Sequence, residues 1–252
     1  MAWFEHGTSR IYYEEEGSGD PLLVIPGWSL SIEDMQFIRQ ALTPRYRVIA
    51  ADAPGSGRSG PQPREYSASY FEDDSRSFLA LLDELGASPA HIVGFSDGGE
   101  YALVMAELRP DAVRSIVAWG AAAQLAVPPE LVEAFGQVVD NPPPPLQEFS
   151  NYLKGAYGEE NARAMTQNWT KALREIMDGG GDISRKRAGE IVCPALLITG
   201  EQDFFAPPTV VSELAAAMQN GEFVEVKGAS HAIHHEQPEW LAQTIVDWLA
   251  KR

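Results

Sequence analysis

Short apolar runs alternate with segments of helical periodicity along most of the chain. Residues 91–95 are one of the compact apolar runs typical of buried strands, whereas residues 70–85 repeat large apolar side chains on one helical face. The predicted strands lie at residues 3–7, 10–16, 22–25, 47–51, 91–95, 115–119, 195–199 and 223–226. The predicted helices lie at residues 33–42, 70–85, 100–109, 161–177, 209–218 and 239–250.

This order predicts an initial strand pair followed by parallel strands with crossover helices, which is typical of an α/β protein with a mostly parallel central sheet flanked by helices. Between residues 124 and 187 no strand pattern occurs, and the connection is too long for a simple crossover. We therefore expect a helical lid, residues 124–187, inserted after the sixth strand of a core formed by residues 1–123 and 188–252. The alternative is a second crossover lengthened by a loop.

The composition indicates a folded domain with an acidic surface. The 252 residues are 44% hydrophobic, and 36 acidic against 19 basic side chains give a formal charge of −17. Nucleic-acid binding depends on Lys and Arg neutralising phosphates, so this balance argues against a nucleic-acid partner. The one dense basic cluster, residues 185–187, is interpreted as a solvated helix face.

The cysteine count and the hydropathy of the chain limit the possible cross-links, metal sites and cellular locations. A single cysteine, Cys193, excludes an intramolecular disulfide and a multi-cysteine zinc site. No apolar run approaches the ~18 residues that a membrane-spanning helix needs, and residues 1–6 lack the pattern of a signal peptide. We expect a cytoplasmic protein with no membrane partner.

Candidate chemistry begins at residues 94–98, Gly-Phe-Ser-Asp-Gly, where a predicted strand gives way to a helix. This is the G-x-S-x-G pattern of a nucleophile elbow in the strand–turn–helix setting that it requires. Small flanking residues permit the sharp turn that lifts the oxygen of Ser96 clear of the sheet. The oxyanion hole needs two backbone N–H donors, which we assign to Asp97 and, from the loop after the third strand, to Trp28.

Ser96 needs a base and an acid to act as a nucleophile. In this architecture the chain order is serine, acid, histidine, which leaves three of the five histidines. His231 is the predicted base because it follows the last strand, where a side chain reaches the carboxyl edge of the sheet. Asp203 is the predicted acid because it follows the strand at 195–199; Glu201 in the same loop is the alternative.

In these features the chain resembles enzymes of the α/β-hydrolase fold. The segments that carry the resemblance are Pro26-Gly27-Trp28, residues 52–59 (Asp-Ala-Pro-Gly-Ser-Gly-Arg-Ser), the elbow, residues 200–203 and residues 230–238. Many relatives have His-Gly where this chain has Pro26-Gly27, a change that preserves the backbone donor. Ser-Asp-Gly-Gly after an aromatic residue is most similar to the valacyclovir hydrolase-like branch of the family.

Two other motifs have structural explanations. Residues 55–60 match G-x-G-x-x-G, but prolines follow where a dinucleotide site needs a helix, so we expect a turn. The cluster His231, His234, His235 and Glu236 is a poor metal site because adjacent histidines on a helix point about 100° apart. We expect no cofactor and no metal, with His234 packed and His235 solvated.

Side chains near the elbow bear on the substrate. Asp97 has three interpretations: an acid favoured by the helix dipole in the first turn, a carboxylate that lines the pocket and pairs with a substrate ammonium, or a member of a structural ion pair. The substrate-binding residues expected besides Asp97 are Trp28, Trp119, Phe204 and Phe205. Trp169 is assigned to the core of the lid.

We therefore expect a serine hydrolase that cleaves small-molecule carboxylic esters of small to medium size through an acyl-enzyme on Ser96. The same three residues support hydrolysis of C–C bonds, thioesters and lactones, as well as perhydrolysis, so the fold leaves the reaction open. A hypothesis from another class is a ligand-binding receptor that keeps the three residues but scarcely turns over.

Overall fold

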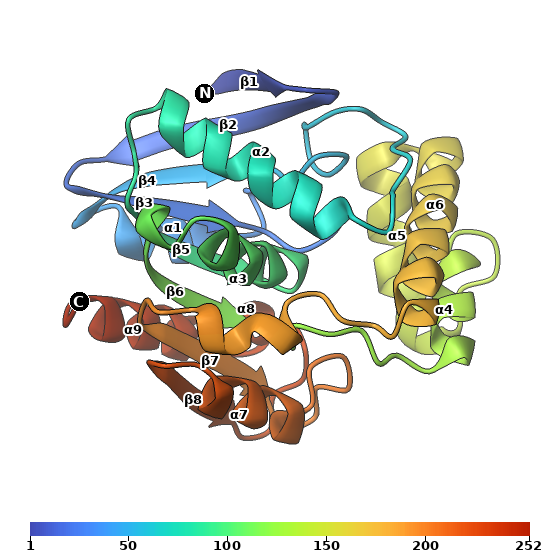
Figure 1. Cartoon of the computed structure of the whole chain (residues 1–252). Coiled ribbons are helices and arrows are strands. Elements are labelled where there is room, and N and C mark those ends of the chain that lie inside the picture. Colours follow the sequence, from blue (N-terminus) through green and yellow to red (C-terminus); the bar gives the residue numbers. More distant parts are fainter.

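The computed structural model covers residues 1–252 and places an eight-stranded sheet between two layers of helices (Figure 1). The strands are β1 (Ala2–His6), β2 (Ser9–Gly17), β3 (Asp20–Ile25), β4 (Tyr46–Ala51), β5 (Ala90–Phe95), β6 (Val113–Trp119), β7 (Ala195–Gly200) and β8 (Gly221–Val226). The helices are α1 (Gln36–Leu42), α2 (Tyr70–Glu84), α3 (Asp97–Leu108), α4 (Pro129–Gly136), α5 (Gln147–Tyr157), α6 (Glu159–Asp178), α7 (Pro208–Ala217), α8 (Ile233–Glu236) and α9 (Pro238–Leu249). Short 3₁₀ turns are η1 (Pro110–Ala112), η2 (Pro144–Leu146) and η3 (Arg185–Glu190).

The sheet has the order β1-β2-β4-β3-β5-β6-β7-β8. β2 is antiparallel to β1 and β4, and all pairs from β4 to β8 are parallel. The chain passes from β3 to β4 on one side and later to β5 on the other, so the strand order reverses between β3 and β5. Loops at such a point leave a crevice beyond the carboxyl ends of the strands. The predicted fold class, a mostly parallel sheet flanked by helices, is confirmed.

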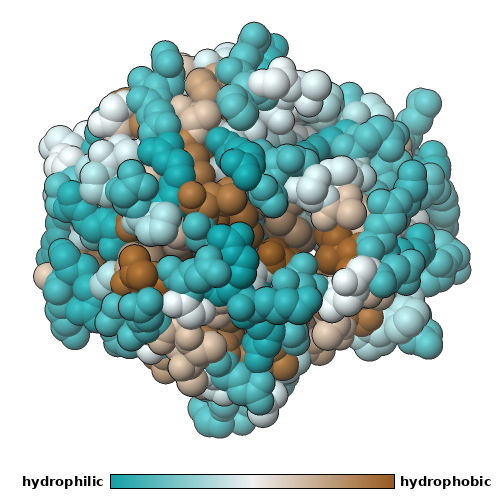
Figure 2. Space-filling view, viewed as in Figure 1, coloured by the Kyte–Doolittle hydropathy of each residue, from teal (hydrophilic) through white to brown (hydrophobic).

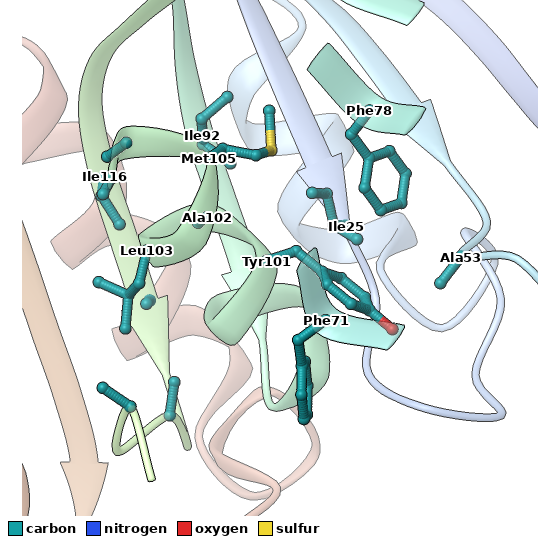
Figure 3. Packing of buried hydrophobic residues seen from close by; sticks show 14 of the residues in the cluster. Ile25, Ala53, Phe71, Phe78, Ile92, Tyr101, Ala102, Leu103, Met105 and Ile116 are labelled. Atoms are coloured by element: carbon teal, nitrogen blue, oxygen red, sulfur yellow. The ribbon is translucent and has the colours of Figure 1, made fainter. Parts of the chain in front are cut away.

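Strand alternation divides the interior into two cores. Leu23 and Ile25 of β3 face the core beneath α2, α3 and α7, whereas Leu22 and Val24 face the core beneath α1 and α9. Figure 3 shows Tyr101 of α3 near Ile25 in the first of these cores. The sheet is therefore buried on both faces, which explains why its parallel strands appear in the sequence as nearly continuous apolar runs.

Some element boundaries differ from the predicted ones. The first helix begins at Gln36 instead of residue 33, because Asp34 accepts hydrogen bonds from the N–H and hydroxyl of Ser31 and holds a turn. α3 begins at Asp97 instead of residue 100, although two glycines occupy its first turn. His234 and His235 lie in a separate short helix, α8, and not at the start of the last helix.

The predicted lid segment, residues 124–187, contains α4, α5, α6 and the two turns η2 and η3. Its three α-helices form a layer beyond the carboxyl ends of the parallel strands (Figure 1). Phe135, Met165 and Trp169 of this layer belong to the same hydrophobic cluster as the core beneath α2 and α3. No helix of the chain combines the length and hydropathy needed to cross a lipid bilayer.

Candidate active site

The turn between β5 and α3 holds Ser96 in the left-handed region, at φ +52°. Two glycines make this turn possible. A Cβ on Gly94 would lie 2.2 Å from the carbonyl oxygen of Gly98, and a Cβ on Gly98 would lie 2.2 Å from that of Ile25. Only glycine fits such approaches, so the G-x-S-x-G pattern follows from packing as well as from turn geometry. The turn leaves the Ser96 hydroxyl at the end of the sheet, within reach of other loops.

The structure brings together the three residues that were predicted to act as nucleophile, base and acid. His231 Nε2 lies 3.1 Å from Ser96 Oγ, and His231 Nδ1 lies 2.9 Å from Asp203 Oδ2. Since the buried carboxylate accepts from Nδ1–H, the Nε2 lone pair faces the serine hydroxyl. The second oxygen of Asp203 accepts the N–H groups of Phe205 (2.9 Å) and Ala206 (3.0 Å), which fixes the carboxylate.

The alternative acid, Glu201, lies outside this chain of hydrogen bonds. Its side chain is exposed and accepts hydrogen bonds from the Lys227 ammonium (3.1 Å) and the Gly228 N–H (3.0 Å). Glu201 therefore pairs with the loop after β8, while Asp203 contacts the imidazole of His231.

The two predicted oxyanion donors lie on either side of Ser96. A Cβ on Gly27 would be 3.2 Å from the Cβ of Ser96, so the loop after β3 passes directly beside the serine. The Trp28 N–H donates to no atom of the chain. The Asp97 N–H opens α3, where no earlier residue of the helix supplies a carbonyl. Both amides are thus available to an oxygen bound next to Ser96.

A cavity of about 450 Å³ lies over Ser96 and His231, between the sheet edge and the lid segment. In the space-filling view a band of hydrophobic surface crosses the middle of an otherwise mostly hydrophilic face (Figure 2). The aromatic side chains that line the cavity are Trp28, Phe71, Phe95, Phe135, Phe149, Trp169, Phe204 and Phe205. Phe204 is 54% exposed, and the ring of Phe205 lies 4.9 Å from that of His231.

Trp119 does not line this cavity, so its predicted role in substrate binding is wrong. Its side chain is completely buried in the core beneath α1 and α9, with its ring against Phe95 and His234. Side chains alternate along β6, and this position faces away from the lid segment. The next residue, Gly120, lines the cavity instead.

Two buried carboxyl groups lie on the wall formed by the start of α3. Asp97 is 7% exposed, and its Oδ2 accepts a hydrogen bond from the Tyr70 hydroxyl (3.0 Å), which in turn accepts one from Trp169 Nε1 (3.3 Å). Burial raises the pKa of Asp97 to about 7 although the Tyr70 hydrogen bond opposes the shift. Burial likewise raises the pKa of Glu100 to about 8, against the N–H groups that it accepts. These two carboxyl groups are therefore mostly uncharged below about pH 7, and the cavity wall gains negative charge as the pH rises above 7.

His234, predicted to be packed, is buried and stays neutral. Its Nδ1 accepts a hydrogen bond from Trp119 Nε1 (3.3 Å), and burial lowers the pKa of His234 to about 3. A neutral imidazole at this position adds no positive charge beside His231. His235 is exposed.

Several residues that line the cavity were not predicted from the sequence, or were predicted to lie elsewhere. Trp169 was placed in the lid core, but its ring stacks on Trp28 at 4.0 Å between centroids and 12° between planes. Phe135 and Phe149 also reach the cavity from α4 and α5. Helical periodicity puts such residues on a buried face without saying which surface they cover. The sequence did contain an indication for Glu100, because an acidic residue in an otherwise apolar helix suggests a buried carboxyl with a specific partner.

The model of the alpha/beta hydrolase family matches residues 22–244, so the chain belongs to this family. Human serine hydrolase BPHL is 27% identical over 203 residues, which cover 79% of this chain and 68% of the human protein. Haloalkane dehalogenase 2 of Mycobacterium tuberculosis is 26% identical over 275 residues, covering 97% and 93% of the two chains.

Solved structures show the same fold. A thermophilic esterase from Thermogutta terrifontis superimposes with a TM-score of 0.76 at 22% identity, covering 96% of this chain and 94% of the esterase. The relatives are hydrolases with different reactions, so the family defines a hydrolase fold and leaves the bond that is cleaved to the chemistry of the site.

Proposed function

We propose that this protein is a serine hydrolase that cleaves carboxylic esters of small to medium size through an acyl-enzyme on Ser96. The observation that carries the proposal is the hydrogen-bond chain Ser96–His231–Asp203 at the floor of an apolar cavity of about 450 Å³. A cavity of this size accommodates small to medium ligands, and its aromatic lining favours apolar groups on either side of the ester.

In the proposed reaction, Ser96 Oγ attacks the ester carbonyl while His231 Nε2 takes the hydroxyl proton. Asp203 stabilises the imidazolium that forms, and the N–H groups of Trp28 and Asp97 bind the oxyanion. His231 then gives its proton to the departing alcohol, which leaves the acyl group on Ser96. Water enters, loses a proton to His231 and attacks the acyl carbon, so that the acid leaves and Ser96 is restored.

The identity of the nucleophile separates this reaction from that of the dehalogenase relative. A serine that displaced a halide from an alkyl carbon would become an ether, which water does not cleave under mild conditions. An ester formed on Ser96 is hydrolysed by the same His231 that assisted its formation. Ser96 therefore supports acyl transfer rather than alkyl transfer.

A fluorophosphonate probe followed by a panel of nitrophenyl esters of increasing chain length tests the proposal. We expect stoichiometric labelling of the wild type, none of Ser96→Ala, and turnover with a preference for apolar acyl groups that fit the cavity. Labelling without turnover of any ester would favour the ligand-binding receptor. Absence of labelling would contradict the assignment of Ser96 as a nucleophile.

A further inference from the structure

The loop after β3 that carries the Trp28 amide has a strained residue at its centre. Ser29 is completely buried and has φ +64°, a left-handed conformation that residues other than glycine rarely adopt. Such a conformation persists only where surrounding contacts hold it. We call residues 26–30 the oxyanion loop, because they lie beside Ser96 and include the proposed donor Trp28.

Both backbone polar groups of Ser29 are hydrogen-bonded, and its carbonyl is held by the lid segment. Its N–H donates to Ser56 Oγ (3.0 Å), a residue of the loop after β4. Its carbonyl oxygen accepts the hydroxyl groups of two tyrosines of α5, Tyr157 at 2.6 Å and Tyr152 at 3.1 Å. The core therefore holds the N–H of Ser29, and the lid segment holds its carbonyl oxygen.

The hydroxyl of Tyr157 makes two hydrogen bonds, one to each of two core loops. Its hydroxyl also accepts the N–H of Gly57 at 2.7 Å, so that a single lid hydroxyl joins the oxyanion loop to the loop after β4. Figure 1 shows that loop running from the sheet to the lid helices. Next to Ser29, the ring of Trp28 stacks on Trp169 of α6 and its Nε1 donates to the Tyr66 hydroxyl (3.1 Å). The residue that supplies the amide is thus held through its side chain and through its neighbour.

From this geometry we infer that Tyr157, assisted by Tyr152, is a positioning residue for the oxyanion hole. The two hydroxyls hold Ser29 in its left-handed conformation and thereby keep the Trp28 N–H directed at the space beside Ser96. Docking of α5 and completion of the oxyanion hole are then a single event, and the lid segment contributes to the chemical step as well as to the shape of the cavity. The inference rests on the proposed serine hydrolase function.

The test compares Tyr157→Phe, Tyr152→Phe and the double variant with the wild type on one apolar nitrophenyl ester. An oxyanion donor that is lost entirely costs about 10²–10³ in kcat, and we expect the loss of its support in Tyr157→Phe to cost about 10-fold with KM little changed. Tyr152→Phe should cost less, because its hydrogen bond is longer and is shared with Asp34. A boronic acid that forms a tetrahedral adduct on the serine should bind more weakly in parallel with kcat.

Tyr12→Phe is the matched control. The Tyr12 hydroxyl is also hydrogen-bonded, to Glu14 Oε1 at 2.6 Å, but lies on β2 and contacts no residue of the oxyanion loop. We expect Tyr12→Phe to lower the melting temperature without lowering kcat or boronic acid affinity. Ser56→Ala, which frees the N–H of Ser29 from the core side, should lower kcat as Tyr157→Phe does.

The outcomes separate this inference from the function on which it rests. An unchanged kcat in the double tyrosine variant, or an equal loss in Tyr12→Phe, would overturn the inference while the wild type remains an active esterase. A kcat that falls only in proportion to the fraction of sites labelled by fluorophosphonate would also overturn it, since misfolding then explains the loss. A wild type that neither labels nor turns over would remove the proposed function and the inference together.

Discussion

Ser96, His231 and Asp203 meet at one point although they follow three different strands, β5, β8 and β7. In the proposed reaction each residue acts through the next, so we expect their contributions to the rate not to be independent. The carboxylate of Asp203 is completely buried and accepts two backbone N–H groups besides the imidazole, so its position does not depend on substrate.

We expect Ser96→Ala or His231→Ala to lower kcat by about 10⁵–10⁶, and Asp203→Asn by about 10⁴, because neither the nucleophile nor its base functions alone. The double variant of Ser96 and His231 should be no worse than either single one. Glu201→Gln in the same loop as Asp203 is the control and should keep kcat. Steady-state ester hydrolysis measures all of these, and an active Ser96→Ala enzyme would contradict the assignment.

Asp97 bears on the class of substrate, because its side chain lines the cavity next to the oxyanion donor. Burial raises its pKa to about 7, so the carboxyl is mostly neutral below that pH and mostly charged above it. A cationic ester should therefore gain over a neutral one as the pH rises through 7. If Asp97 serves only to bind the Tyr70 hydroxyl, no such trend exists.

A betaine ester, which carries a permanent trimethylammonium group, and its neutral 3,3-dimethylbutanoate isostere provide the comparison. We expect the ratio of kcat/KM for the two to rise between pH 6 and 8 by up to about 10-fold, since a charge pair at ~4 Å is worth roughly 1–4 kcal/mol before desolvation is deducted. In Asp97→Asn the rise of the ratio between pH 6 and 7.5 should be largely lost, and only the weaker rise from Glu100, whose pKa is about 8, should remain at the upper end. Equal losses for both esters in that variant would make Asp97 structural at the elbow.

The residues that the sequence identified share a property: their places depend on local features. Ser96 sits in a short motif that immediately follows β5, and Asp203 and His231 lie in the loops that follow β7 and β8. Trp119 was misplaced because a strand end does not reveal which face its last side chain takes. Trp169 was misplaced because its partner, Trp28, lies far away in sequence and depends on how the lid segment docks.

At the scale of elements, one side chain of α3 is hydrogen-bonded to the backbone at the point where the chain enters the lid segment. Glu100 accepts the N–H groups of Ala122 (2.8 Å) and Ala123 (3.1 Å), where the chain leaves β6. The carbonyl of Ala123 in turn accepts the N–H groups of residues 183–185, where the chain returns. The two ends of the lid segment are therefore tied to each other and to α3, the helix that directly follows Ser96.

We expect Glu100→Ala to loosen both ends of the lid segment. It leaves two buried N–H groups without acceptors, at a cost of about 1–3 kcal/mol each. Hydrogen exchange followed by mass spectrometry should show faster exchange in residues 121–126 and 181–186, with the strands protected as before. Glu107→Ala is the control for residues 121–126: that acid lies on the same helix, contacts the lid segment only through Arg187 at 3.7 Å and accepts no backbone N–H, so exchange there should stay as in the wild type. Equal exchange rates in wild type and Glu100→Ala would contradict the coupling.

The helix α3 also shows why element boundaries were harder to predict than the elements. Two glycines in its first turn lower helix propensity, and the predicted helix began only after them, at residue 100. The structure begins the helix at Asp97 because packing of Gly98 against the backbone of β3 outweighs that local cost. Close approach between segments distant in sequence has no signature in periodicity.

At the scale of the whole molecule, a formal charge of −17 coexists with three buried acids that bear on stability. Asp97, Glu100 and Glu107 are each less than a tenth exposed, and burial raises their pKa values to about 7, 8 and 8. In the unfolded chain the same groups lose their protons near pH 4. Through these three groups the folded protein binds more protons than the unfolded chain between about pH 4 and 8. Buried His91 and His234, whose pKa values are lowered to about 4 and 3, act in the opposite direction below about pH 6.5.

The free energy of unfolding should consequently fall as the pH rises from 6 to 8. Each proton of difference contributes about 1.4 kcal/mol per pH unit, so we expect the free energy of unfolding to fall by several kcal/mol, on the order of 5, over this interval in urea unfolding. Repulsion among the surface carboxylates also weakens the fold, but added salt screens it, whereas salt screens buried groups far less. The slope that persists at high salt therefore belongs to the buried acids. Glu107→Gln should reduce that slope while leaving ester hydrolysis intact. A stability that does not change between pH 6 and 8 at high salt would show that these three carboxyls are already ionised in the folded protein at pH 6.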